Sequence, residues 1–370
     1  MESITTLAGL SKLSIVQAQL VTAAGTDTAQ ILAEVMNEFP HARAQQGWFT
    51  HVNVSEPTEI IAADIETIDS TDPTDRMLDM LLVWLEQITW PEHPPEHIYL
   101  LAPVDLTTWL QKKLPNTNAQ WHWFNELIPC LNDWNTRLEN SPPSHASDQP
   151  SQEANTLLIA LDSQIQPEPW YDQRGDLYHE HNQDGRLVGE GLAALWLQET
   201  ATPTVTGPLY YCREPKAALA AEDTTYSLKS LFDQAPTATF SALLSNHSPS
   251  RLHACELHYF TSQVTQARRR EAQPADTPSD NDLDDNLTVY HYPRAIEPPL
   301  NDSPANLAAS LGDTGLATLP MQLALVHLSQ RYANQMPPWQ ALIHLCADNR
   351  FYWPMALPEP HQTNHREAQK

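Results

Sequence analysis

Two uninterrupted apolar runs in the middle of the chain constrain its fold most strongly. The first, Leu157–Asp162, is a strand-like segment that ends in a polar turn, and the second, Gly191–Gln198, follows a Gly-Glu-Gly turn. Strands with apolar residues at successive positions are typical of sheets covered by helices on both faces. Strand-like segments also alternate with helical patterns in both halves of the chain. The sequence therefore predicts an α/β fold with parallel-rich sheets.

The other elements follow from periodicity and turn residues. Apolar residues at helical spacing predict the helices, and Thr26, Asp27 or Thr28 is expected to cap the first of them. Pro129 indicates a kink or break inside one predicted helix. Helices are predicted just after residue 28 and over Asp75–Trp90, Trp121–Leu138, Thr225–Gln234, Arg251–Arg269 and Leu316–Tyr332. Further strands are predicted over Leu13–Gly25 with its turn, His97–Val104, Phe240–Leu244, Leu287–Tyr292, Trp339–Leu345 and Phe351–Leu357. Loops are expected over 41–52, 141–155 and 271–286, the last two flexible, and the tail from Pro358 is expected to fray.

Composition and charge disfavour several classes of function. The chain has 20 Lys and Arg residues against 46 Asp and Glu residues, a formal charge of −26, and its basic run Arg268–Arg270 is followed by acidic residues. A nucleic-acid partner is not expected, because phosphate binding depends on clustered basic side chains. Four dispersed cysteines form no Cys-Xaa-Xaa-Cys pair, so neither a disulfide framework nor a zinc knuckle is expected. The N-terminal segment MESITTLAGLSKL has no secretory pattern and no stretch has the length of a membrane helix. We therefore expect a soluble cytoplasmic protein without a membrane partner.

Four segments carry patterns that recur in a known order. They are Val21–Gly25 at the end of the first strand, the strand end Asp162-Ser163 with the later Gly189–Ala194 (GEGLAA), the segment Arg251–His258, and Leu311–Ala317 (LGDTGLA) before a long apolar helix. The order resembles the β-ketoacyl synthase branch of the thiolase-like family. There an Ala-Asp-Ser-like strand end precedes a Gly-Glu-Gly-Ala-Ala-type motif, and a Gly-His-Xaa-Xaa-Ala-Ala-Gly segment follows later. The resemblance implies a thiolase-like five-layer αβαβα sandwich built from two related halves, residues 1–200 and 201–370, that form a single compact unit.

The residues that such condensing enzymes use for catalysis are not at the matching positions. The resemblance implies a Cys thiolate at the start of the helix that leads into the Leu157 strand, yet the nearest thiol, Cys130, is predicted to lie mid-helix. Asp313 occupies the place of the Gly-His histidine, and a carboxylate offers no donor to an acyl oxygen. His291 is the nearest candidate for the second histidine, without the glycines of the family loop. We therefore predict no catalytic residue and no enzymatic activity.

Two other groups of residues raise the question of a bound ligand. Asp176, His179, Glu180, His181 and Asp184 crowd one loop that could bind a metal, but a hydrophilic surface loop explains them as well. Gly189-Glu190-Gly191 is too short to indicate a phosphate site, and a tight turn at a strand entry is the favoured interpretation. We predict neither a metal nor a cofactor.

Tryptophan is abundant in one region of the chain. Trp109, Trp121, Trp123 and Trp134 lie among other apolar residues, and core packing is the favoured explanation. The alternative is an aromatic patch that binds another protein, since Trp side chains dominate interface energetics.

The favoured function is binding rather than catalysis. A chain of this size that lacks the catalytic Cys and His residues looks like the thiolase-like co-chaperones of bacterial type VI secretion. That resemblance implies two protein partners, a dedicated effector chaperone and a secreted toxin effector, and the acidic charge would suit a basic cargo. Two alternatives stay open: an active β-ketoacyl synthase-like acyl transferase, and a non-catalytic partner subunit of a ketosynthase heterodimer. A homodimer is also open.

Overall fold

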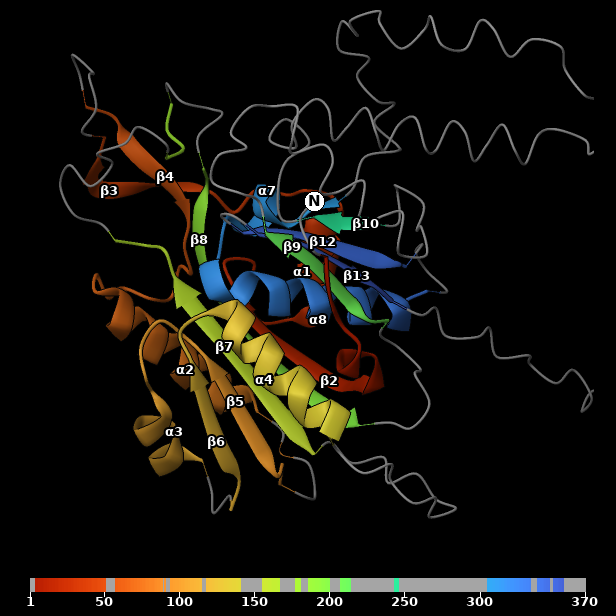
Figure 1. Ribbon diagram of the computed structural model, residues 1–370. Coiled ribbons are helices and arrows are strands. Elements are labelled where there is room, and N and C mark those ends of the chain that lie inside the picture. The colour runs from red at the N-terminus through yellow and green to blue at the C-terminus, as the bar shows by residue number, and fades with distance from the viewer. Residues whose placement is uncertain are drawn as a thin grey trace, which may run out of the picture.

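The computed structural model describes residues 4–50, 57–88, 90, 94–114, 118–140, 155–166, 177–180, 186–199, 207–213, 243–245, 305–333, 338–346 and 349–355. Two β-sheets face each other across a layer of helices (Figure 1). None of the helices in these ranges has the length and apolar composition needed to cross a bilayer.

The first sheet has seven strands. They are β2 (Leu13–Thr22), β3 (Arg43–Phe49), β4 (Glu59–Ala63), β5 (His97–Leu101), β6 (Gln120–Phe124), β7 (Thr156–Ser163) and β8 (Val188–Glu199). Their order is β3-β4-β8-β7-β5-β6, and β2 pairs with β8 beyond the short contact of β4. Strands β5, β6 and β7 are parallel, whereas β8 is antiparallel to both β7 and β2. Every residue of β7 is buried, and so are the first ten of β8, as their unbroken apolar runs predicted.

The second sheet repeats this arrangement. Its strands are β1 (Thr5–Leu7), β9 (Leu209–Arg213), β10 (Leu243–Ser245), β11 (Ala305–Asn306), β12 (Ala341–Cys346) and β13 (Asn349–Pro354). The order is β1-β9-β13-β12-β10-β11, with β13 antiparallel to β12 and to β9. Across the second sheet the strands lie in the order β11-β10-β12-β13-β9, and across the first sheet in the order β6-β5-β7-β8-β2. If the five strands of each set are numbered along the chain, both orders read third, second, fourth, fifth, first. In both sheets the fifth strand is antiparallel to its two neighbours. Strand β1 pairs with β9 at the edge of the second sheet, so a segment near the N-terminus belongs to the sheet that is otherwise formed by residues 209–354.

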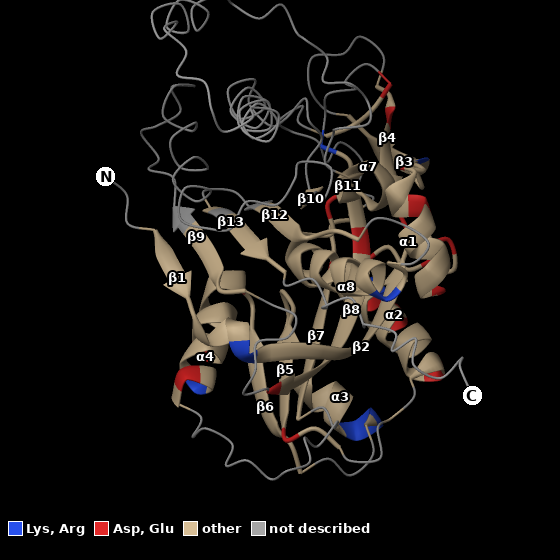
Figure 2. Ribbon diagram, turned by 90° about the vertical axis from the view of Figure 1, so that its right-hand side faces the viewer, with Lys and Arg blue, Asp and Glu red and all other residues tan. Residues whose placement is uncertain are grey.

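Helices fill the space between the sheets and cover the outer face of the first. They are α1 (Thr28–Met36), α2 (Pro73–Gln87), α3 (Thr107–Lys113), α4 (Leu127–Asn140), α7 (Leu307–Leu311) and α8 (Thr318–Arg331), with the 3-10 turns η1 (Gly9–Lys12) and η5 (Gly315–Ala317). Helix α8 lies between the two sheets (Figure 2), in contact with β2 and β8 on one side and with β10 and β12 on the other. Residues 318–329 are therefore all buried. Helix α4 packs into the same core, whereas apolar residues of α2 and α3 pack on the outer face of β5, β7 and β8.

Most predicted elements within the described residues are confirmed with shifted ends. The Asp27 carboxylate caps α1 by accepting hydrogen bonds from the backbone nitrogens of Ala29 and Gln30, both at 2.9 Å. The strands predicted near residues 13, 97, 157, 191, 339 and 351 and the helices predicted from Asp75 and Leu316 are present as β2, β5, β7, β8, β12, β13, α2 and α8.

Three local predictions are wrong. The helix predicted over Trp121–Leu138 is a strand, β6, followed by α4, because pairing with β5 extends the aromatic segment. Residues 41–52, expected to form a loop, contain β3, which pairs with β4. Gly189-Glu190-Gly191 is not a turn before a strand but part of β8 itself.

Several predicted elements lie outside the described residues. They are the helices over Thr225–Gln234 and Arg251–Arg269, the strand over Leu287–Tyr292, the loop over 271–286, the tail from Pro358, and all of the 141–155 loop except residue 155. Of the strand predicted over Phe240–Leu244, the described part begins at Leu243 and forms β10.

Candidate functional site

The motif segments around Gly189 and Asp313, one from each half of the chain, meet beside the start of α8. The Gly189 backbone nitrogen donates to the Asp313 carbonyl oxygen at 2.9 Å, and the Asp313 nitrogen donates to the Leu187 carbonyl oxygen at 2.7 Å. A Cβ atom on Gly189 would collide with the carbonyl oxygen of Leu311. Gly315 has φ +56° and lies against the Asp162 carboxylate, where a side chain would also collide. The glycines therefore allow the backbones of the two motifs to touch.

Glu190, the central residue of the Gly-Glu-Gly segment, forms a buried ion pair. Its side chain is fully buried and accepts from Nε of Arg76 at 2.7 Å and also from Nη2 of the same guanidinium. It further accepts from the Ile65 nitrogen and the Ser163 hydroxyl, both at 2.8 Å, while Arg76 donates to the Ile68 carbonyl oxygen at 3.1 Å. The pair thus joins α2, the 65–68 segment and strands β7 and β8. The Glu190 carboxylate is therefore satisfied by hydrogen bonds from within the fold.

Two further carboxylates lie at this junction. Asp162 is 5 % exposed and accepts from the Leu316 nitrogen and from Nε2 of Gln164, both at 3.0 Å. Burial, with a smaller contribution from the nearby Asp313, raises the pKa of Asp162 to about 6. Asp313, the residue that the sequence analysis compared with a family histidine, pairs with Arg186 at 3.2 Å. Asp313 therefore serves as an acceptor in this loop, not as a donor to a substrate.

Cys130 lies closer to a helix start than the sequence predicted. It is the fourth residue of α4, so the mid-helix placement is wrong, and Pro129 falls in the first turn, where a missing N–H breaks no helix. The thiol is 2 % exposed, and burial raises its pKa well above the ordinary value, with Asp133 adding to the effect. The space beside it is about 10 Å³ and is lined by apolar residues that include Leu158, and this is at the lower limit for one water molecule.

Only some of the other candidate residues, the second histidine and the possible metal ligands, lie within the described residues. His291, Asp176, His181 and Asp184 lie outside the described residues. His179 is buried, with Nδ1 3.2 Å from the Thr58 hydroxyl, whereas Glu180 is exposed. Within the described ranges, no three His, Cys, Asp or Glu side chains are grouped so that they could hold a metal ion.

The four tryptophans do not form one patch. Trp134 is buried in the core between the sheets, and Trp109 and Trp121 pack at the margin of the outer apolar cluster. Among these four, Trp123 has the most exposed side chain, at 38 %, and its indole nitrogen donates to the Ala102 carbonyl oxygen at 3.1 Å. Trp123 lies on β6, which pairs with β5 and with no other described strand. Core packing is thus confirmed for Trp134, and Trp123 lies on a sheet edge that has no second neighbour among the described strands.

The sequence did not predict a polar cluster formed by side chains of β5, β6 and α4. Nδ1 of His97 and Nε2 of His122 are 3.3 Å apart, and the His122 ring stacks on Tyr99 with 4.5 Å between centroids. The Tyr99 hydroxyl donates to Asp133 at 3.1 Å, and the Arg137 guanidinium lies over the same tyrosine ring. Burial lowers the pKa of both histidines. The two histidines are 25 residues apart, and only the pairing of β5 with β6 brings them together.

Comparison with solved structures identifies the fold. Similar structures include the ishigamide ketosynthase/chain length factor, with 12 % identity and a TM-score of 0.55 over 94 % of this chain and 99 % of that chain. A type II polyketide synthase acyl-carrier protein in complex with its ketosynthase gives 9 % identity and a TM-score of 0.54 over 93 % and 98 %. Ketosynthase twelve of the bacillaene polyketide synthase from Bacillus amyloliquefaciens gives 9 % identity and a TM-score of 0.53 over 94 % of this chain and 73 % of that chain.

Sequence comparisons add nothing to this structural likeness. No family model matches the chain, and no curated protein matches it. At identities this low the likeness shows the fold alone. The chain has the thiolase-like α/β fold of the ketosynthases, as its motif order predicted.

Proposed function

We propose that this chain is a non-catalytic thiolase-like subunit that binds a second subunit of the ketosynthase type. The observation that carries the proposal is the environment of Cys130. A thiol held protonated by burial, beside a space of about 10 Å³, can neither attack an acyl thioester nor hold its chain. The residues just before α4, Asn125 and Glu126, supply no alternative thiol.

The choice of partner is supported by the comparisons and by the open edge of β6. One of the similar structures is named as a ketosynthase together with its chain length factor, and this chain covers 99 % of the matched chain. A strand edge that lacks a neighbour offers backbone groups to another chain, and Trp123 supplies an exposed aromatic side chain beside it. We therefore place the contact with the partner subunit along β6.

The type VI secretion role stays a prediction, because the comparisons do not bear on an effector or its chaperone. It differs from the favoured proposal in the partner alone, and the same experiment separates the two. Tagged full-length chain is purified from its native host, and co-purifying proteins are identified by mass spectrometry. A ketosynthase-like partner supports our proposal, whereas a toxin with its chaperone, or the absence of any partner, contradicts it.

Two measurements sharpen this experiment. Trp123→Gln should weaken capture of the partner at least about tenfold, as expected for an aromatic interface anchor, whereas the matched control Leu82→Gln should not. Leu82 is a suitable control because it is also exposed, at 42 %, but lies on the outer face of α2. Incubation with an acyl-thioester probe should leave Cys130 unmodified in peptide mapping. Acylation of any one cysteine that is lost on its replacement by Ala would establish an enzyme instead.

A further inference from the structure

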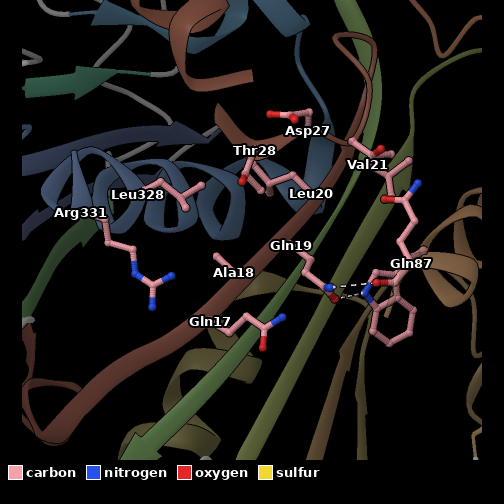
Figure 3. Close-up of a pocket in the computed structure, with 12 residues that line it drawn as sticks. Gln17, Ala18, Gln19, Leu20, Val21, Asp27, Thr28, Gln87, Leu328 and Arg331 are labelled. Atoms are coloured by element: carbon pink, nitrogen blue, oxygen red, sulfur yellow. Dashed lines mark hydrogen bonds between the residues drawn. The ribbon is translucent and has the colours of Figure 1, made fainter. Parts of the chain in front are cut away.

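A groove runs along the outer edge of β2, away from the junction described above. Its volume is about 420 Å³, and its lining residues come from β2, the start of α1, α2 and α8 (Figure 3). Strand β2 forms the floor from Gln17 to Val21. Gln87 of α2 lies on one side, and Leu328 and Arg331 of α8 lie on the other (Figure 3), and Trp84 of α2 also lines the groove.

The floor of the groove is a strand edge with backbone groups directed outward. β2 pairs with β8 on one side, and no described strand pairs with its other side over Gln17–Val21. Thr22 uses its outward N–H and C=O to bond Gly25, at 2.9 and 2.8 Å. Because alternate residues of a strand direct their backbone groups to the same side, Leu20 and Ala18 present theirs to the groove. Both residues line it.

The walls hold this edge in place and give it opposite charges at its two ends. Nε1 of Trp84 donates to the Gln19 side chain at 3.0 Å, and Gln19 donates to the Gln87 carbonyl oxygen at 3.4 Å. Nη2 of Arg331 donates to the Val16 carbonyl oxygen at 2.8 Å, which places a cation where the groove begins. The Asp27 carboxylate lies at the other end of the groove.

We propose that an extended segment of another polypeptide binds this groove by adding a strand to β2. The backbone groups of Ala18 and Leu20 would pair with the segment, as in other cases of strand addition. An antiparallel segment is favoured because its ladder is the more stable one. Such a segment would place its C-terminal end beside Arg331 and its N-terminal end beside Asp27. The matching partner therefore carries an acidic residue near the C-terminal end of the segment and a basic residue near the N-terminal end. The inference rests on the proposed protein-binding function, but it concerns an edge other than β6.

The test uses a synthetic heptapeptide, Lys-Thr-Val-Thr-Val-Thr-Glu, with blocked ends and a fluorescent label, and the full-length chain. We expect saturable binding by anisotropy, together with slower amide hydrogen exchange confined to the β2 segment. The reversed peptide, of equal composition, should bind several-fold more weakly. Arg331→Glu should weaken binding at least about fivefold, whereas the matched charge reversal Lys112→Glu, on exposed α3, should not.

A backbone variant provides a second test. Ala18→Pro removes an N–H that faces the groove and leaves the β8 ladder intact, since proline is tolerated on strand edges. Binding should be lost while far-ultraviolet circular dichroism is unchanged; if that variant does not fold, Arg331→Glu decides. Absence of saturable binding, or protection outside β2, would overturn the inference. If the native partner is captured equally well by Arg331→Glu and Ala18→Pro, the proposed function stands and this groove is not the site. Peptide binding without any captured partner would reject the proposed function alone.

Discussion

Replacement of Arg76 by Met tests whether the buried ion pair with Glu190 holds the motif junction together. Arg76 and Glu190 have side-chain exposures of 5 % and 0 %, so the change leaves a carboxylate buried without its counter-charge. Loss of one partner of a buried pair costs about 3–5 kcal/mol. For a chain of 370 residues, with an unfolding entropy of about 2 cal/mol/K per residue, this corresponds to a fall in Tm of about 4–7 °C.

Thermal unfolding at pH 7, followed by circular dichroism, measures this effect. The double variant Arg76→Met with Glu190→Gln should unfold at a higher temperature than Arg76→Met alone, because it buries no charge. Arg186→Met is the control, since the Arg186 and Asp313 side chains are 39 % and 29 % exposed and such pairs contribute at most about 1 kcal/mol. The reasoning is wrong if Arg76→Met unfolds within about 1 °C of the unmodified chain, or if the double variant is no more stable than the single one.

Four further variants test the packing and the titration of buried groups. Asp162 has a pKa of about 6 in the folded chain, so its protonated form stabilises the fold at low pH, and this contribution is lost as the pH rises from about 4 to 6. At pH 7 the buried carboxylate is charged, and Asp162→Asn should therefore be more stable than the unmodified chain. We expect a difference of about 2–3 kcal/mol in denaturant unfolding. Burial lowers the pKa of His327 to about 4, so the neutral side chain contributes to stability above pH 6.5 and this contribution is lost as the pH falls towards 4. His327→Leu should therefore lose less stability on acidification than the unmodified chain. An unchanged dependence of the unfolding free energy on pH would contradict this. Gly189→Ala should lower stability by about 1–3 kcal/mol through its collision with the Leu311 carbonyl oxygen. Gly191→Ala should cost less, since the atoms nearest its added Cβ belong to a flexible methionine side chain, and equal costs would refute the argument.

Local sequence predicted the parts of the fold in which one pattern extends over a whole element. The apolar runs identified the strands β7 and β8, the apolar residues of Leu316–Tyr332 identified α8, and the polar residues 26–28 marked the start of α1. The same logic failed at Trp121–Leu138. There the aromatic residues of β6 continue directly into the helical pattern of α4, and only hydrogen bonding to β5 distinguishes strand from helix.

The candidate sites were less accessible to sequence reasoning than the fold. The chain shows that Glu190 lies between two glycines, but not that Arg76, 114 residues earlier, neutralises it. The sequence predicted Cys130 in the middle of a helix, whereas the thiol lies in the first turns of α4 and its burial depends on packing between α4, β7 and α8.

The sequence by itself determined the class of those elements that carry one unbroken pattern, such as β7, β8 and α8, and the positions of Cys130 and Asp313 in the chain, because these are properties of single positions and short patterns. The tertiary structure alone decided which strand edges lie open, which charges are paired and how little space surrounds Cys130. Those features arise from contacts between residues that are distant in the chain, and no local pattern specifies them.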